Sequence, residues 1–233
     1  MLTVLQTALE VGLIYGLVAL ALFISFSILN IADLSTDGCF TLGCAVGAML
    51  TIAGHPILAL FAAMAAGMLS GYVTAFLQTR LGVESILAGI ISNTGLYTIN
   101  LAVMGFSSNV SITGVDTVFS LFKGLVGGQW NRLILLALIV AVVVIVLIRF
   151  FGTSLGLSIR ATGDSLDMVS ASSINPKATI TIGLCLANAL TALSGCLIGE
   201  YNKFCDINLG TGMVTIALAS LIIGEVFAGH RGG

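Results

Sequence analysis

The chain has 233 residues, of which 58% are hydrophobic and only 8% charged, and its formal net charge is −2. Soluble domains carry roughly a quarter of charged residues, because a solvated surface must cover their core. This chain cannot build such a surface, so we expect lipid to be its outer solvent. The negative charge also argues against nucleic acid as a partner, since binding it requires a basic face.

Residues that commonly bind metals are few and scattered. The five cysteines include no CxxC pair, and only two histidines are present. Small buried cysteines are common in apolar cores, so we interpret these as core residues. We therefore expect no metal site.

Uncharged stretches long enough to cross a bilayer recur along the chain, and they predict about seven membrane spans. The first stretch lacks the basic flank and cleavage site of a signal peptide, so we expect it to remain as a helix. Gly54 and Pro56 predict a tight connection between the second and third spans. The predicted fold class is an all-α, polytopic transmembrane bundle, and the stretches are 11–32, 38–54, 57–79, 85–105, 133–148, 178–199 and 208–224.

Lysine and arginine favour one orientation of these spans, because cytoplasmic loops are enriched in both residues. One set of alternate connections holds Arg80, Arg149, Arg160, Lys177 and Arg231, and the other set holds Lys123, Arg132 and Lys203. This bias favours an external N-terminus, a cytoplasmic loop at 149–177 and an outer loop at 106–131 that acts as a lid or docking surface.

Two polar interruptions break the apolar pattern, and each places an acid and small polar residues before a glycine-containing span. They lie around Asp33 to Asp37 and around Asp206 to Thr211. In the favoured orientation they open from opposite sides of the membrane, as in transporters built from inverted repeats with broken helices. We therefore predict a solute pathway lined by Asp33, Thr36, Asp37, Asn208 and Thr211.

The span at 85–105 contributes further polar residues. Asn93, Tyr97 and Asn100 are spaced to share one helix face, where they could bind a zwitterionic or hydroxylated solute. Hydrogen bonding between helices is the alternative role for this face. Glu10 and Glu225 lie near span ends, and we expect both to be solvated.

The loop at 149–177 predicts a short helix of about ten residues, with Asp164 as its N-cap, Asp167 in its first turn and Pro176 as its end. It presents Leu166, Met168 and Ala171. An apolar helix that projects into the cytosol requires a partner to cover it. Contact with lipid headgroups is less attractive, because the helix lacks a Lys/Arg face.

The run from Arg160 to Met168 resembles the coupling-helix signature of permeases in the branched-chain amino-acid and sugar importer family of ABC transporters. The runs 31–38, 87–105, 114–119 and 219–225 agree with its tryptophan/tyrosine transport branch, in family order along nearly the whole chain. The resemblance implies a single permease domain over 1–233 in a bacterial inner (plasma) membrane. Family members continue past Gly229 with one or two further helices, so it also implies that the chain lacks these.

The resemblance implies a subunit plan as well. ABC ATPase subunits would contact Arg160, Asp164, Leu166, Asp167, Met168 and Ala171. A second permease copy, identical or related, would complete the pore, and an extracytoplasmic solute-binding protein would deliver an amino acid, aromatic in that branch. The chain contains no GxxxxGK[ST] loop, so we expect it to hold no cofactor and ATP to bind the partner subunit.

Two alternatives belong to other classes. A self-sufficient secondary transporter or channel would need an ionisable group buried in mid-span, a role open to Asp33 and Asp37 if their interruption lies deep. An intramembrane enzyme would use Ser154, which lies in a GxSxG match, but that motif needs a strand-to-helix elbow and a triad. We therefore expect no catalytic residues.

Overall fold

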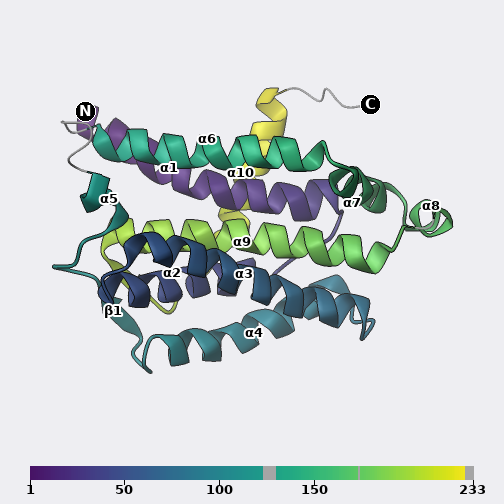
Figure 1. The fold of residues 1–233 in the computed structure, drawn as a ribbon, viewed down its shortest axis with the longest axis horizontal. Helices are drawn as coiled ribbons and strands as arrows, with labels where there is room; N and C mark the ends of the chain where they lie inside the picture. The colour runs from purple at the N-terminus through teal and green to yellow at the C-terminus, as the bar shows by residue number, and fades with distance from the viewer. Residues whose placement is uncertain (123–129, 173, 229–233) are drawn as a thin grey trace.

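The computed structural model describes residues 1–122, 130–172 and 174–228, which form a bundle of helices (Figure 1). Of the residues used for orientation, Lys123 and Arg231 lie outside this description, as does the chain beyond residue 228. The elements are α1 (Leu2–Leu22), the π-helical η1 (Phe23–Ile28), α2 (Thr36–Ile52), α3 (Pro56–Thr79), α4 (Ser85–Val103), β1 (Asn109–Ser111), α5 (Val118–Leu121), α6 (Asn131–Phe151), α7 (Ser154–Asp164), α8 (Leu166–Ala171), α9 (Pro176–Asn202), β2 (Phe204–Asp206) and α10 (Met213–Ala228).

The apolar stretches predict these helices well. Within the described residues, 5 helices are long and apolar enough to cross a membrane, and α2 and most of α10 are shorter apolar helices. The first span differs from the predicted 11–32, since its helix starts at Leu2 and ends at Ile28. Pro56 opens α3 and Gly54 adopts a φ of 87°, as the tight connection requires. The chain is thus an all-α, multi-pass integral membrane protein.

Helix α9 is the centre of the bundle. Of its most apolar window, 83% is buried, compared with 17% for α6. Glycines let neighbouring helices approach it closely: a Cβ at Gly43 of α2 would overlap the Ala192 carbonyl, and one at Gly67 of α3 would overlap that of Asn188. Close approach of this kind is how membrane helices gain packing energy without a hydrophobic driving force.

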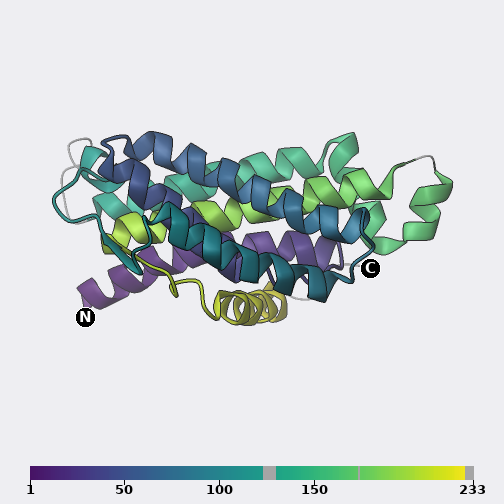
Figure 2. The same ribbon diagram turned by 90° about the horizontal axis from the view of Figure 1, so that it is seen from below.

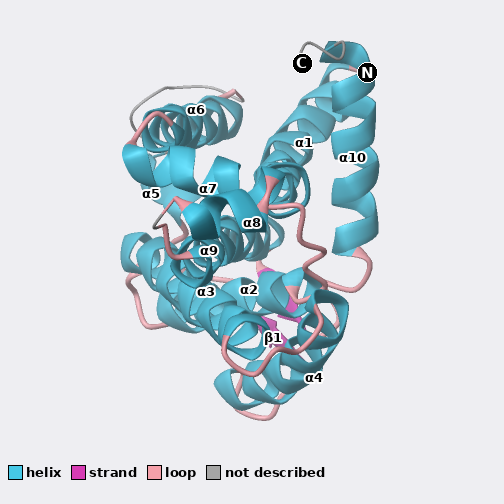
Figure 3. Cartoon of the chain, turned by 90° about the vertical axis from the view of Figure 1, so that its right-hand side faces the viewer, coloured by secondary structure: helices cyan, strands magenta, loops and turns pink. Residues whose placement is uncertain are grey.

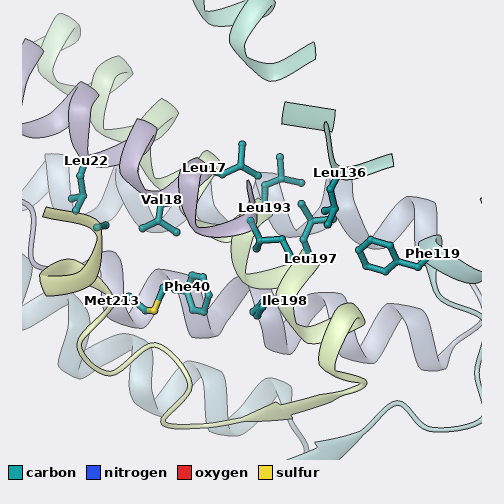
Figure 4. Packing of buried hydrophobic residues seen from close by; sticks show 12 residues of the cluster. Leu17, Val18, Leu22, Phe40, Phe119, Leu136, Leu193, Leu197, Ile198 and Met213 are labelled. Atoms are coloured by element: carbon teal, nitrogen blue, oxygen red, sulfur yellow. The ribbon is translucent and has the colours of Figure 1, made fainter. Parts of the chain in front are cut away.

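The largest core cluster joins elements that are distant in sequence. Leu17, Val18 and Leu22 of α1 pack with Phe40 and with Leu193, Leu197 and Ile198 of α9 (Figure 4). Leu136, Phe119 and Met213 extend the same cluster to α6, α5 and α10.

The bundle has two distinct ends (Figures 1 and 2). At the first, the ribbon end, β1 and β2 pair antiparallel with Val110 opposite Cys205. This ribbon joins the segment after α4 to the segment after α9. At the second, the α8 end, α7 lies near the end of α9, and α8 projects beyond the other helices. The described parts of the predicted outer loop and of the predicted cytoplasmic loop therefore lie at opposite ends.

Helix α10 differs from the others in direction. Figure 2 shows it end-on beneath the bundle, while Figure 3 shows its full length beside α1, so it runs across the long axis of the other helices. Only its first residues are well buried, Met213 and Val214 among them, whereas Ile222, Ile223 and Phe227 are exposed.

Both predicted interruptions are breaks that run deep into the bundle. We call residues 29–35 break 1 and residues 207–212 break 2. Break 1 leaves the α8 end, where Leu29 packs on Gly183, and climbs until Asp33 contacts Asn188 in the middle of α9. Break 2 leaves the ribbon end, where the Ile207 amide donates to the Ser108 carbonyl, and descends to the start of α2.

Candidate functional site: a polar cavity where two breaks meet

The two breaks meet at Asp37, in the first turn of α2. Its carboxylate accepts hydrogen bonds from the amides of Gly212 (3.0 Å) and Val214 (2.9 Å). These amides begin α10, where unpaired N–H groups and the helix dipole favour a negative charge. Asp37 therefore caps a helix that follows it by some 175 residues in sequence.

A second contact holds break 2 against α2. The Gly210 amide donates to Oγ1 of Thr41 at 3.1 Å. A Cβ at Gly210 would overlap the Asp37 carbonyl oxygen, so only glycine permits this approach.

Beside this junction lies a cavity of about 410 Å³ between α2, α4 and break 2, which we call the junction cavity. It is large enough for a small solute. Six of the predicted pathway residues line it together: Asp37, Asn93, Tyr97, Asn100, Asn208 and Thr211. Thr94, another polar residue of the same span, also lines it, as do Thr41 and Thr98, which sequence reasoning did not single out.

Asn100 supplies a defined acceptor at this cavity. Its side chain is 1% exposed, and its Nδ2 donates to the Gly38 carbonyl at 3.0 Å. That bond fixes which end of the amide is nitrogen, because an oxygen there would face another oxygen. Oδ1 has no partner within the described residues, so a donor from a solute or water would satisfy it.

The chemistry of the lining is that of a weak binding site. Among the described residues of the lining, Asp37 is the one charged residue, and the remaining polar side chains carry hydroxyls and amides. Such a lining favours solute groups that donate hydrogen bonds, an ammonium group in particular, and offers no cation to a carboxylate.

Two predicted pathway residues lie elsewhere. Asp33 is 1% exposed and accepts hydrogen bonds from the Ser35 amide, the Ser35 hydroxyl and Nδ2 of Asn188. Thr36 is also buried and donates to the Asp33 carbonyl. The structure places both between α2 and α9, where they close break 1 instead of lining the cavity.

The predicted short helix at 164–176 is wrong in its bounds and its cap. Asp164 is the last residue of α7, and Ser165 caps α8 by accepting from the Met168 amide. Helix α8 has only 6 residues, and Pro176 opens α9 instead of ending α8. The cap moves because Ser165 adopts the extended backbone that an N-cap requires, while Asp164 remains helical.

The surface of α8 nevertheless presents the predicted apolar residues. Leu166 and Met168 are 53% and 59% exposed, while Val169 is buried and anchors the helix. Ala171, Asp164 and Asp167 are also exposed, and Arg160 lies on α7 over the ring of Phe151 at 5.8 Å.

Helix α7 contacts break 1 directly through main chain. A Cβ at Gly163 would overlap the Ile28 carbonyl oxygen and crowd Cα of Leu29. The two backbones therefore touch where η1 ends and break 1 begins.

Two buried acids differ from expectation or were not anticipated. Glu10, expected to be solvated, is 3% exposed and accepts from Gln6 and from the Tyr201 hydroxyl. The burial of Glu10 could have been inferred from the sequence, because Thr3, Gln6, Thr7 and Glu10 are spaced to form one polar face of α1. Glu200 is 1% exposed and accepts from Thr51 and from the Val118 amide, which ties α5 to the bundle. Glu225 is exposed, as expected, and accepts from Ser27.

Comparisons with known proteins agree with this architecture. A family model described as the permease component of branched-chain amino acid transport systems matches residues 4–230. A tyrosine transport system permease protein of Clostridioides difficile is 35% identical over 214 residues, which cover 91% of this chain and 70% of that protein. An uncharacterized protein of Rickettsia prowazekii is 34% identical over 222 residues, covering 95% of this chain and 77% of that protein. No solved structure matches.

The family model matches nearly the whole chain, and the tyrosine transport permease is 35% identical to it. Together these two findings assign the chain to a family. The chain belongs to the family of permease components of branched-chain amino acid transport systems.

Proposed function

We propose that this chain is the permease subunit of an ATP-driven ABC importer that carries an amino acid into the cytoplasm. The observation that carries the proposal is α8, a helix at one end of the bundle whose exposed Leu166 and Met168 need a partner. An ABC ATPase is the partner that this family would supply. ATP would bind that subunit, and this chain would take no cofactor.

Energy would reach the pore through α8. Closure of an ATPase pair on ATP would displace α8 and α7, and the backbone contact of Gly163 with Ile28 would pass that displacement to break 1. A second permease copy, identical or related, would complete the pore across the bilayer. An extracytoplasmic binding protein would deliver the solute at the ribbon end.

The solute would pass through the junction cavity. Similarity to a tyrosine transport permease supports an aromatic amino acid. Asp37 and Oδ1 of Asn100 would accept from its ammonium group, and the half-exposed ring of Tyr97 would lie against its side chain.

The test is uptake of labelled tyrosine into vesicles that contain this chain, its ATPase and its binding protein. We expect uptake to require ATP hydrolysis and to survive ionophores that dissipate ion gradients. Met168→Asp should abolish uptake and binding-protein-stimulated ATP hydrolysis together, because it places a charge in an apolar contact. Met168→Leu is the matched control and should retain both.

A gradient-driven transporter is the second candidate, and Asp33 is the observation that favours it. This carboxylate is buried beside Asn188, near the middle of α9, as a proton or sodium site would require. Uptake that persists without the ATPase and stops with ionophores would establish this candidate and refute the first.

A further inference from the structure

A second polar cavity, which we call the ribbon-end cavity, has no place in the function proposed so far. It measures about 380 Å³ and lies among α1, α5, α6 and the end of α9. Glu10, Arg132, Tyr201 and Lys203 line it, together with buried Thr117 and Asn131. It therefore holds charged groups of both signs, whereas Asp37 is the one charged residue among those that the structure describes around the junction cavity.

The negative group is the carboxylate of Glu10, a residue that is only 3% exposed. Its hydrogen bonds come from neutral donors, Nε2 of Gln6 at 2.9 Å and the hydroxyl of Tyr201 at 2.9 Å. Within residues 1–122, 130–172 and 174–228, no cation forms an ion pair with this carboxylate. A buried carboxylate in such surroundings is stabilised when a positive group binds to it.

The positive groups are Arg132, at the start of α6, and Lys203, which follows α9. The Arg132 guanidinium lies 5.8 Å from the centre of the Tyr201 ring, and the Tyr201 hydroxyl donates to Glu10, so this phenol contacts both charged groups. Both cations are exposed, and within the described part of the chain neither forms an ion pair with a carboxylate. Arginine binds a carboxylate in a bidentate manner where one is available.

We propose that the ribbon-end cavity is a capture site for a free zwitterionic amino acid. Glu10 binds the ammonium group, and Arg132, assisted by Lys203, binds the carboxylate, while Tyr201 contacts both Glu10 and Arg132. A solute with a single charge would leave the opposite group of the site unpaired, so the site selects against it. This inference rests on the proposed transport of amino acids and adds a second site, separate from the junction cavity.

The protein carries its own reporter for this site. Trp130 is the single tryptophan of the chain, it is 49% exposed, and it directly precedes Asn131 in the cavity wall. We would reconstitute the full chain in phosphatidylglycerol vesicles and titrate it with phenylalanine under tryptophan-selective excitation. Phenethylamine, which lacks the carboxylate, and 3-phenylpropanoate, which lacks the ammonium group, are the matched ligands.

We expect phenylalanine to change Trp130 fluorescence saturably and both single-charge analogues to bind about tenfold more weakly or worse, as for loss of one buried charge partner. Arg132→Gln should reduce the preference for phenylalanine over phenethylamine, and Arg132→Gln combined with Lys203→Gln should abolish it. Glu10→Gln should make the affinities for phenylalanine and 3-phenylpropanoate equal. Asp116→Asn removes an exposed acid beside the cavity and should change nothing. Arg132 is exposed, so its variant keeps the test valid if the Glu10 variant fails to fold.

Equal binding of the three ligands, no saturable response, or unchanged selectivity in all of these cavity variants would overturn the proposal. A phosphatidylethanolamine headgroup carries an ammonium and a phosphate, so the titration is repeated with that lipid present. If the lipid alone changes Trp130 fluorescence and phenylalanine changes nothing, the site binds lipid and the proposal fails. ATP-dependent uptake with a silent Trp130 would refute the capture site alone, whereas absent uptake with a normal titration would refute only the importer.

Discussion

Break 1 and break 2 run into the bundle from opposite ends, yet they are held in different ways. Break 1 is closed by side chains: Asp33 is buried and bonded to Asn188 of α9 and to Ser35. Break 2 is held by its backbone amides, which donate to Asp37 and Thr41 of α2. Its side chains Asn208 and Thr211 are left free to line the junction cavity.

The contrast shows that two similar acids can have different roles, Asp33 a structural role and Asp37 a role beside the cavity. Asp33 and Asp37 lie one helical turn apart in sequence, but one stabilises a buried joint and the other positions a wall of the cavity. Irregular backbone persists in a membrane only when buried or facing a cavity, and this chain uses one break in each way.

The largest expected effect is at Asp33. Asp33→Ala removes the acceptor for three hydrogen bonds in a buried joint, so the free energy of unfolding should fall by about 3 kcal/mol or more. Thermal unfolding in detergent measures this, with exposed Asp167→Ala as the control. Normal stability combined with lost uptake would place Asp33 in the transport pathway and erase the contrast between the breaks.

Gly210→Ala should cause the second-largest loss in the free energy of unfolding. The added Cβ overlaps the Asp37 carbonyl, so break 2 must move away from α2 at a cost of about 2 kcal/mol. Gly12→Ala is the matched control, because its Cβ meets open space in a helix, and it should be neutral or slightly stabilising. Equal melting temperatures for the two variants would show that break 2 is not packed on α2.

Asp37→Asn should cost less, about 1 kcal/mol, because an amide nitrogen cannot accept from the α10 amides and the charge at the helix start is lost. Amide hydrogen exchange at Gly212 and Val214 should accelerate, while exchange at β1 and β2 stays slow. Unchanged exchange at both amides would contradict the role of Asp37 as the cap of α10.

Asn208→Leu should have the smallest effect on stability, within about 0.5 kcal/mol, because the side chain is exposed. Uptake should fall about fivefold through loss of one hydrogen bond to the solute. Ser220→Leu, on the exposed surface of α10, is the control for added hydrophobicity. Wild-type uptake by Asn208→Leu would remove break 2 from the solute pathway.

Hydropathy and residue type predict much of this fold. The helices match the apolar stretches because lipid leaves few other ways to satisfy backbone groups. The polar runs around Asp37 and Asn208 predict the two breaks, and helical spacing places Asn93, Tyr97 and Asn100 on one wall.

The sequence alone could not show which polar groups are hydrogen-bonded to each other in the fold. Asp33 and Asp37 look alike as sequence, and only the approach of Asn188 and Gly212 distinguishes them. Likewise, the burial of Glu10 depends on Tyr201, a residue 191 positions away. The cap of α8 depends on the backbone angles of two adjacent candidates, Asp164 and Ser165, which composition does not reveal.

The contact of Gly163 with Ile28 places α7 directly against the end of η1, at the α8 end of the bundle. Side chains can change rotamer and absorb a displacement, but two touching backbones cannot. A shift of α7 toward η1 would therefore displace the backbone at the end of η1 directly, because no side chain lies between the two backbones at this contact. Break 1 begins at that contact, so if α7 is displaced during transport we expect the buried joint at Asp33 to be the first part of break 1 to rearrange.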